Sequence, residues 1–600
     1  MILERSEVAP EYKWDLTKVY KTEEDFYKDY KLCEGKIASF SAHEKTMITS
    51  AENLYAALVD MSDIEELINK LWCYASLNFS TDTSNNAYQA LTAKVRSLAV
   101  SAGTASWFFT PYILRLDADV VEKWFGECGG LLRFERLIRK TLAYKPYTLS
   151  DEGEKLMSGI EDCLGSHSDI RSVFANSDMT HGKVKDENGN RVELTEANFA
   201  IFLRSSDRKV RSAAFKSMYK SYAQFKNTFA GLFSGRVKES TTLAATRGYK
   251  NSITASTFKD EVTPEIYNNL IKTVEAGLPA LYEYYDLQRE LLGVEKLHLY
   301  DIYTPLINSA SKKYTYEEAV SEVLDTVKIY GDEYYNALKS GLCERGWVDV
   351  YPTKAKRSGA FSAGCPSTEP YILLNFNGNY DDMSTNAHEA GHSMHTWFST
   401  KYNEPQNSGY TIFVAEVAST VNELLLAHKK LREAENDDEK LYILNQLMET
   451  YKGTLYRQTM FAAFEKDMHA LTEKGEPLTA DVISKRYYKL VKKYFGKNVA
   501  VDKEIMYEWA RIPHFYSCFY VYKYATCISA ASAIVKRIEN EGAAYVGKYI
   551  DFLKCGDSKS PLDSLLVAGI DMRDPAVVSD AVSDFEQSVR QFKELYSKKN

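Results

Sequence analysis

The chain has 600 residues, of which 45% are hydrophobic and 26% charged, and its formal net charge is -9. This length is far more than one compact core usually holds, so we expect two or more lobes. The acidic balance excludes a general nucleic-acid-binding protein, and no apolar run reaches the length that spans a membrane.

Composition also predicts the fold class. Only 14 Pro and 30 Gly interrupt the chain, and long stretches are rich in Glu, Lys, Leu and Ala. These residues favour helices, so we expect a mainly α protein.

The first residues and the cysteines indicate a compartment. The opening segment, residues 1–7, lacks the apolar core of a signal peptide. The nine cysteines are scattered, odd in number and form no C-x-x-C pair. Such cysteines are typical of reduced thiols and not of a disulfide framework or a cysteine zinc site. We therefore expect a cytoplasmic protein.

The N-terminal part is predicted to be helical and to end in a hairpin. Over residues 23–168, apolar residues recur with helical spacing between charged ones. Residues 179–194 then predict a β-hairpin with a tight turn at Asn188-Gly189. We place a boundary near this hairpin, with residues 1–200 as an N-terminal helical lobe and residues 201–600 as a second domain.

Three segments of the second domain can be assigned before its main motif. Ser206-Asp207 is expected to cap a long helix. Residues 356–364 are expected to form a flexible loop, and residues 371–376 have the composition of a strand. The edge of that strand is either free to pair with an extended peptide, or the strand is an ordinary core strand; the sequence favours neither.

The motif His388-Glu389-Ala390-Gly391-His392 carries the chemistry of the chain. Because positions i and i+4 lie on one face of a helix, His388 and His392 can direct both imidazoles at one ion. Glu389 lies about 100° around the axis, where it can hold a water molecule instead. This pattern predicts a zinc site.

The alternative is an amphipathic helix with two solvated or core-satisfied histidines. With 10 His in 600 residues, such a motif arises by chance in about one chain in a hundred. The context favours the zinc site, because Ser384 or Thr385 is expected to cap the helix start. Met394, Trp397 and Phe398 then supply apolar packing after the motif.

Three residues compete to be the third ligand. His395 shares the helical face, but a further turn adds about 5 Å, which is too far for a bond of about 2 Å. Glu416 and Glu423 lie on the next expected helix, residues 412–428. Glu416 stands in an apolar run, and a metal gives a reason to bury a carboxylate there, so we choose Glu416. Glu423 is either an acceptor for a ligand histidine N–H or a surface carboxylate.

Two histidines and one glutamate leave a fourth zinc position open, which distinguishes catalytic from structural zinc. The segments 388–395 and 413–420 resemble the zinc segments of the thimet-type oligopeptidases, and more closely those of oligoendopeptidase F. The likeness extends along most of the chain, in Trp14-Asp15-Leu16, Ser358-Gly359-Ala360-Phe361, Leu374-Asn375-Phe376 and Ala568-Gly569-Ile570-Asp571-Met572. The resemblance implies a two-lobed helical clamshell with a deep central channel, which admits short unstructured peptides and excludes folded proteins. We also expect a small β-sheet beside the zinc helix.

Peptide hydrolysis also needs hydrogen-bond donors for the oxyanion. Residues 511–524 are the candidate segment, because Tyr516, Tyr520 and Tyr524 are spaced by four, as on one helical face, and His514 precedes them. A tyrosine stripe is also typical of a helix core. The resemblance implies a His and Tyr residues on a late helix that face the zinc. We carry these roles to His514 and Tyr520, with Tyr524 and Tyr516 as alternatives.

The predicted function is that of a zinc metalloendopeptidase with one Zn²⁺ per chain, acting on short oligopeptides. Glu389 acts as general base toward water and then passes the proton to the leaving amine, while zinc and His514 or a tyrosine hydroxyl stabilise the oxyanion. Two alternatives are a helical peptide-binding protein with a silent metal site and a zinc exopeptidase. We expect peptide substrates as partners, no nucleic acid and no membrane; the oligomeric state is left open.

Overall fold

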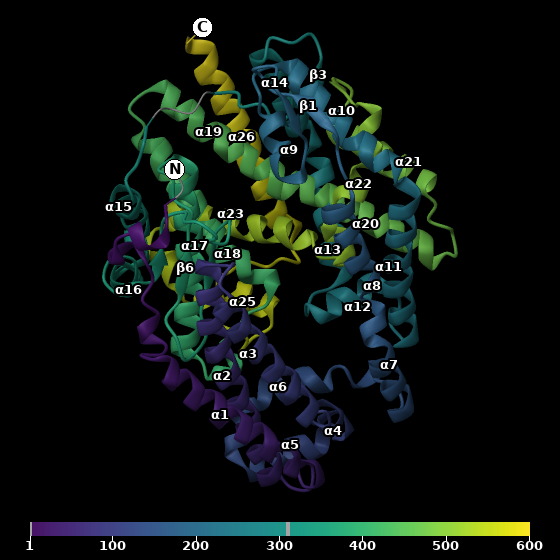
Figure 1. The fold of residues 1–600 in the computed structure, drawn as a ribbon, viewed down its shortest axis with the longest axis vertical. Helices are drawn as coiled ribbons and strands as arrows, with labels where there is room; N and C mark the ends of the chain where they lie inside the picture. Colours follow the sequence, from purple (N-terminus) through teal and green to yellow (C-terminus); the bar gives the residue numbers. More distant parts are fainter. Residues whose placement is uncertain (1–2, 308–311, 600) are drawn as a thin grey trace. The chain divides into compact units, whose positions relative to one another are not determined.

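The computed structural model describes residues 3–307 and 312–599, and these residues are mostly helical. They form the helices α1 to α26 and the short strands β1 to β7. Figure 1 traces these elements along the chain. The prediction of a mainly α protein is confirmed.

The chain forms two compact units, each assembled from three segments. Unit 1 comprises Met1–Pro146, Ser311–Lys429 and Ile534–Ile570. Unit 2 comprises Tyr147–Ala310, Lys430–Ala533 and Asp571–Asn600. The expectation of more than one lobe is confirmed. The division into residues 1–200 and 201–600 stays a prediction, since the compact units group segments by contact and not by order in the chain.

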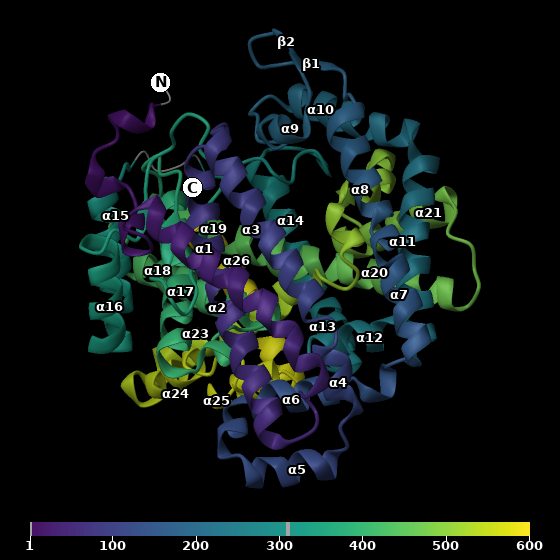
Figure 2. The ribbon, with the colours of Figure 1, turned by 60° about the horizontal axis from the view of Figure 1, so that its bottom comes forward.

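Unit 1 begins with three long helices that lie side by side, as Figure 2 shows. The first two start at ordinary N-caps: Thr22 accepts a hydrogen bond from the N–H of Asp25, and Ser50 accepts one from the N–H of Asn53. Their apolar faces form one continuous buried cluster. The helices that lie mainly in unit 1 are α1 (Glu23–Phe40), α2 (Ala51–Thr81), α3 (Asn86–Ala105), α4 (Phe109–Arg115), α5 (Ala118–Glu127), α6 (Glu135–Leu142), α15 (Tyr316–Val327), α16 (Asp332–Cys343), α17 (Tyr380–Tyr402), α18 (Ile412–Glu433), α24 (Ala543–Leu553) and α25 (Pro561–Val567).

A small sheet in unit 1 packs against helix α17. Its strands are β4 (Val348–Asp349), β6 (Tyr371–Leu373) and β5 (Phe361–Ala363), with β6 in the middle, parallel to β4 and antiparallel to β5. The predicted sheet beside this helix is confirmed. Because β6 is paired on both sides, the core-strand alternative for residues 371–376 is right and the free-edge alternative is wrong.

Strand β5 forms one edge of this sheet, in the segment expected to be a flexible loop. That expectation is wrong for β5, because Phe361 and Ala363 pack against the buried cluster of unit 1 and so hold the strand in place. The residues before β5 are also held, since the Nδ2 of Asn375 donates to the carbonyl oxygens of Arg357 and Gly359 at 3.0 and 2.7 Å.

Helix α17 starts five or six residues earlier than expected. Asn379 is its N-cap and accepts a hydrogen bond from the N–H of Asp382 at 2.9 Å, while the side chain of Asp382 accepts the N–H of Asn379 at 3.1 Å. This capping box fixes the first turn, so the expectation that Ser384 or Thr385 caps the helix is wrong. The extra turn leaves the motif in the middle of a rigid helix.

Unit 2 is also helical, with two small two-stranded sheets. The predicted hairpin is confirmed, since β1 (Lys183–Lys185) and β2 (Arg191–Glu193) pair antiparallel around Gly189, whose φ is +82°. Asp207 caps α10 as expected. Strands β3 (Leu297–His298) and β7 (Val499–Ala500) pair in parallel. The helices that lie mainly in unit 2 are α7 (Asp151–Leu164), α8 (Ser166–Val173), α9 (Glu196–Leu203), α10 (Arg208–Gln224), α11 (Lys226–Thr246), α12 (Ser252–Lys259), α13 (Pro264–Ala276), α14 (Leu278–Leu291), α19 (Asp437–Tyr451), α20 (Arg457–Glu473), α21 (Ala480–Phe495), α22 (Glu508–Arg511), α23 (Tyr522–Glu541) and α26 (Pro575–Lys599).

The tyrosine stripe does not lie on one helix. Tyr516 ends the short 3₁₀ helix η12 (Pro513–Tyr516), and α23 begins only at Tyr522. Between them Phe519 has a φ of +56°, in the left-handed region that interrupts any right-handed helix. The expectation that Tyr516, Tyr520 and Tyr524 share a helical face is therefore wrong.

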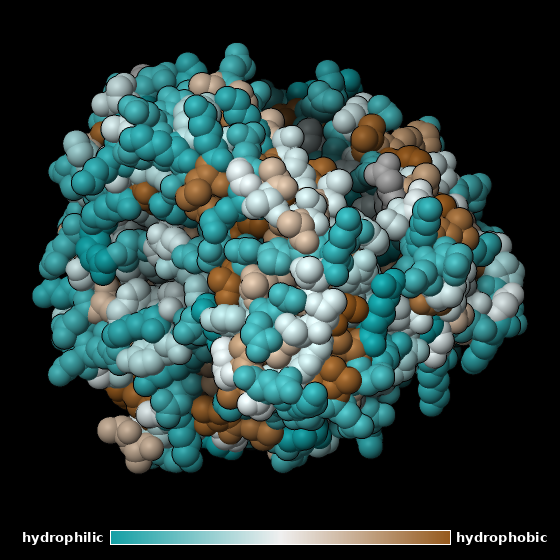
Figure 3. Space-filling view, turned by 90° about the horizontal axis from the view of Figure 1, so that it is seen from below, coloured by the Kyte–Doolittle hydropathy of each residue, from teal (hydrophilic) through white to brown (hydrophobic). Residues whose placement is uncertain are grey.

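One face of the molecule shows mainly polar side chains. On the face in Figure 3 hydrophilic side chains predominate, and apolar ones appear in scattered patches between them. Among the described residues, no helix combines the length and the apolar character needed to cross a membrane.

Candidate metal centre

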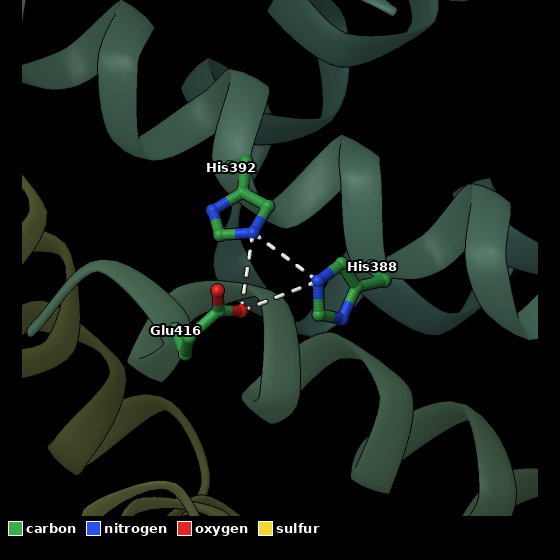
Figure 4. Close-up of side chains that lie close together, drawn as sticks. All are labelled: His388, His392 and Glu416. Carbon is green, nitrogen blue, oxygen red and sulfur yellow. Dashed lines mark hydrogen bonds and ion pairs between the residues drawn. The ribbon is translucent and has the colours of Figure 1, made fainter. Parts of the chain in front are cut away.

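Three side chains predicted to be metal ligands come together in unit 1. His388 and His392 project from α17, and Glu416 projects from the first turns of α18. Figure 4 shows the two rings and the carboxylate pointing toward one another. The two Nε2 atoms are 3.2 Å apart, and each lies 3.3 Å from Oε2 of Glu416.

The spacing of these donor atoms fits a zinc ion. Atoms bound to one tetrahedral zinc at about 2.0–2.1 Å lie about 3.3–3.4 Å apart. The three sides of the observed triangle, 3.2, 3.3 and 3.3 Å, match this value closely. Two imidazoles and one carboxylate are also a donor set found in catalytic zinc sites. On a tetrahedral ion, these three donors would occupy three corners and leave the fourth for water or substrate.

Within the described ranges 3–307 and 312–599, no second group of three or more His, Cys, Asp or Glu side chains has a spacing that suits a metal ion. All three members of the group are half-buried, so each keeps a solvent-accessible side. The donor set, its spacing and its partial exposure together suit a metal that reacts with small molecules.

A close crossing of α17 and α18 brings Glu416 to the two histidines. A Cβ on Gly391 would lie 2.6 Å from the carbonyl oxygen of Ala418 and 2.6 Å from the Cα of Ser419, so only glycine permits this approach. Asn422 on α18 is 1% exposed, and its Nδ2 donates to the carbonyl oxygen of Ala387 on α17 at 3.1 Å. These contacts fix the register of the two helices.

Further side chains orient the donors. The Oγ of Ser419 donates to Oε2 of Glu416 at 3.1 Å, and Oε2 of Glu423 lies 3.3 Å from Nδ1 of His388. The latter contact suits the acceptor alternative for Glu423, since a carboxylate on Nδ1 leaves Nε2 to bind a metal.

The electrostatics of the centre favour a bound cation. Burial raises the pKa of Glu416, but the hydrogen bonds from His388 and His392 outweigh burial and hold the pKa well below its usual range. Burial lowers the pKa of His388, yet the charge of Glu423 and the hydrogen bond to Glu416 raise it well above its ordinary value. The carboxylates therefore draw positive charge to the imidazoles, whether it is supplied by a proton or by a metal ion.

Glu389 has the properties of a general base. It is 5% exposed, and its Oε2 is buried without a hydrogen-bond partner in the described part of the chain. Burial raises the pKa of Glu389, and the neighbouring charges of His388 and His392 oppose that rise. A carboxylate with an unsatisfied oxygen and a raised pKa is suited to accept a proton from water.

His395 lies outside the donor group, as the helical rise predicts. Its ring is 1% exposed and stacks on Tyr410 with 3.8 Å between ring centroids. Burial lowers the pKa of His395 to about 3, so the ring is neutral and serves as packing.

The predicted oxyanion residues lie in unit 2. His514, Tyr520 and Tyr524 form a cluster, hereafter the ring cluster, with ring centroids 5.5 to 6.2 Å apart. His514 is exposed and both tyrosines are half-buried. Tyr516 is 5% exposed and packs on Phe233, so it belongs to the core. The catalytic roles of His514 and Tyr520 stay predictions.

Sequence reasoning considered Glu423 but missed other residues that support the centre. Ser419, Asn422 and the close approach at Gly391 were not predicted. A polar Asn422 within the apolar run of α18 gave the same signal that selected Glu416, namely a buried polar group that needs a partner. The sequence did not indicate the role of Gly391, because a glycine within a helix is needed only where another segment packs directly against it.

The chain matches two family profiles and several known proteins along most of its length. The profile of peptidase family M3 matches residues 201–583, and that of Oligopeptidase F matches residues 113–181. Oligopeptidase PepF of Bacillus subtilis is 40% identical over 99% of this chain and 89% of its own length. An oligoendopeptidase F homolog of Lactococcus lactis is 34% identical over 100% and 99% of the two chains. The crystal structure of oligoendopeptidase-F from Enterococcus faecium superposes with a TM-score of 0.77 and 33% identity, covering 96% of this chain and 99% of that one.

Proposed function

Because this chain belongs to peptidase family M3, we propose that it is a zinc metalloendopeptidase that hydrolyses internal bonds of short, unstructured oligopeptides. The observation that carries the zinc assignment is the triangle formed by His388, His392 and Glu416, with sides of 3.2 to 3.3 Å. The preference for oligopeptides is supported by the names of the relatives, which are oligopeptidases and oligoendopeptidases.

The proposed chemistry divides between the ion and the side chains around it. A bound zinc ion supplies Lewis acidity, which makes water acidic near neutral pH and polarises a carbonyl group. Glu389 takes the proton of the attacking water on its free Oε2. It then delivers that proton to the nitrogen of the leaving amine, so it ends the cycle ionised again.

The oxyanion needs a donor in addition to the ion. We assign this role to the ring cluster, with the hydroxyl of Tyr520 or the imidazole of His514 donating to the developing negative charge. Partial desolvation and the charge of Arg171 lower the pKa of His514, so near neutral pH its ring is uncharged and donates through a single N–H. A donor of this kind contributes about 10²- to 10³-fold to kcat in other hydrolases.

The decisive experiment measures cleavage and zinc on one sample. Internally quenched peptides of increasing length, blocked at both ends, are incubated with the protein before and after dialysis against a chelator. We expect internal cleavage, identified by mass spectrometry, that is lost with the zinc and restored by adding it back. Cleavage only of peptides with a free terminus would instead support an exopeptidase. Peptide binding without any cleavage by the zinc-loaded protein would support the silent peptide-binding protein.

The compartment is part of the same proposal. All nine cysteines are free thiols in the structure. Free thiols suit a reducing compartment, which supports a cytoplasmic peptidase.

A further inference from the structure

The turn before Tyr520 contains an unfavourable backbone conformation. Phe519 has a φ of +56°, and the described residues hold only two other non-glycine residues with positive φ, Glu261 and Ala355. A bulky aromatic residue rarely adopts this region, so surrounding contacts must hold it there. Since the turn directs the next side chain, the residue that holds Phe519 also decides where Tyr520 points.

The contact that holds Phe519 comes from a buried carboxylate. The backbone N–H of Phe519 donates to Oε1 of Glu465 at 2.5 Å, and Glu465, in α20, is 0% exposed. The ring of Phe519 is 1% exposed and packs on Tyr267 and His469, with ring centroids 5.7 and 4.3 Å away. The side chain therefore fills a core site while its amide is fixed by Glu465.

Within the described residues, the Phe519 amide is the one hydrogen-bond partner of the Glu465 carboxyl group. Its Oε2 is also buried and accepts no hydrogen bond within the described part of the chain. Burial raises the pKa of Glu465 to about 8, opposed by the Phe519 amide and the charges of Lys523 and Arg236. A carboxyl group is costly in such surroundings. Its one hydrogen bond goes to the strained residue of the turn.

The chain on both sides of Phe519 is anchored independently. The Nε of Arg236 donates to the carbonyl oxygen of Tyr516 at 2.9 Å. After the turn, Asp260 accepts hydrogen bonds from the hydroxyl of Tyr522 at 2.9 Å and from Nζ of Lys523 at 2.8 Å. Glu465 thus contacts the backbone between these anchored residues, at Phe519, where φ becomes positive.

From these contacts we propose that Glu465 is a positioning residue, which holds Phe519 in its left-handed conformation and thereby fixes the hydroxyl of Tyr520 for catalysis. The inference rests on the proposed role of Tyr520 in peptide hydrolysis. Glu465 touches neither substrate nor metal in this scheme and acts through the backbone of the turn. Its effect should therefore fall on kcat and leave zinc binding unchanged.

A double-mutant cycle with Tyr520→Phe tests the inference. We expect Glu465→Ala and Tyr520→Phe each to lower kcat about 10- to 100-fold, with KM within about twofold, since small misplacements of a catalytic group have effects of this size. If Glu465 acts through Tyr520, the kcat of the double variant should lie within about threefold of the kcat of Tyr520→Phe. Zinc content should stay at the wild-type value in all three.

Two further variants separate positioning from general structure. Glu465→Gln keeps an acceptor for the Phe519 amide and should recover most of the lost kcat. Glu473, on the same helix, accepts the backbone N–H of Ser252 at 2.8 Å, so Glu473→Ala removes a similar contact elsewhere and should leave kcat unchanged. If Glu465→Ala does not fold, Glu465→Asp takes its place, because its shorter side chain cannot reach the amide.

Hydrogen–deuterium exchange gives a readout that does not depend on activity. The peptide that contains Phe519 should exchange faster in Glu465→Ala than in the wild type, and not faster in Glu473→Ala. A wild-type kcat in Glu465→Ala, or an undiminished effect of that change in the Tyr520→Phe background, would overturn the inference and leave the proposed function intact. A wild-type kcat in Tyr520→Phe would instead overturn the role of Tyr520, and the inference with it.

Discussion

The metal centre of unit 1 and the ring cluster of unit 2 differ in the backbone that carries them. The histidines of the centre sit in the middle of α17, a helix of 23 residues, and Glu416 sits on α18, which crosses it. In the ring cluster, His514 lies in the short 3₁₀ helix η12, and Tyr520 lies on irregular backbone between η12 and α23. A regular helix sets the direction of its side chains by its own hydrogen bonds, whereas a turn takes its direction from outside contacts.

The supporting contacts differ in the same way. Around the metal centre the key contacts are between two helices that pack closely at Gly391 and share the hydrogen bond from Asn422. Around the ring cluster, the polar side chains of Arg236, Asp260 and Glu465, which are far apart in the chain, each hold one point of the turn. We expect the first site to respond to changes in helix packing and the second to changes in single polar side chains.

The largest effect should follow removal of a donor from the metal centre. Glu416→Ala leaves two imidazoles, so zinc affinity should fall more than about 100-fold, the upper loss seen when only an outer partner of a ligand is removed. Two measurements check this prediction: the zinc content after dialysis and the rate of peptide hydrolysis. Glu433→Ala, at the end of the same helix and on its surface, should change neither. Full zinc content in Glu416→Ala would show that another residue is the third donor.

Glu389→Gln should separate metal binding from turnover. Gln cannot accept a proton, so kcat should fall about 10²- to 10⁴-fold, the contribution of a general base, while zinc content stays at one ion per chain. Single-turnover kinetics and metal analysis on one preparation measure both. Cleavage at the wild-type rate would show that the buried carboxylate next to the histidines is not the base.

The close helix crossing can be tested at a single position. Gly391→Ala places a methyl group 2.6 Å from backbone atoms of α18, so the helices must separate and the donor triangle must open. We expect zinc affinity to fall about 10- to 100-fold and the Tm to decrease. Gly103→Ala in α3 is the matched control, since nothing lies within 4 Å of its added Cβ. It should be neutral or stabilising by about 0.5–1 kcal/mol. Unchanged zinc affinity in Gly391→Ala would show that the metal centre does not depend on close packing of α17 and α18, and so would remove its distinction from the ring cluster.

The prediction with the smallest effect on activity concerns the protonation of Glu465 in unit 2. Burial raises its pKa from the usual 4.5 to about 8. Between these two values the folded protein holds a proton that the unfolded chain has lost, so stability should fall as the pH rises from about 4.5 to 8 and level off above. Each unit of pKa difference corresponds to about 1.4 kcal/mol.

Glu465→Gln cannot ionise and should lack this dependence. The Tm of the variant relative to the wild type should therefore increase from pH 5 to pH 8. Thermal unfolding at several pH values measures the trend, with Glu473→Gln as the control on the same helix. A constant difference in Tm across this range would mean that Glu465 stays ionised in the folded protein.

Much of the fold and of the metal centre could be predicted because the governing rules are local. Helical spacing placed His388 and His392 on one face, and the cost of burying a carboxylate selected Glu416 from a helix of otherwise apolar residues. The hairpin at Asn188-Gly189 and the cap at Asp207 follow from turn and capping chemistry within a few residues. In each case the residues that decide the structure are neighbours in the chain.

The predictions that failed depended on distant partners. Spacing by four suggested a helix through Tyr516, Tyr520 and Tyr524, but the carboxylate of Glu465 holds Phe519 in a conformation that ends any helix there. Residues 356–364 have the composition of a loop, yet residues 361–363 pair with β6 and form β5, one of the two edge strands of the sheet.

The sequence by itself determined which residues have the chemistry to bind a cation and to activate water, because that chemistry and its helical spacing are written within a few turns of the chain. Only the tertiary structure decided how closely α17 and α18 approach, which strand forms the sheet edge and how the turn before Tyr520 is held. The physical reason is that each of these depends on backbone contacts between segments far apart in the chain, such as Gly391 with Ala418 or Phe519 with Glu465.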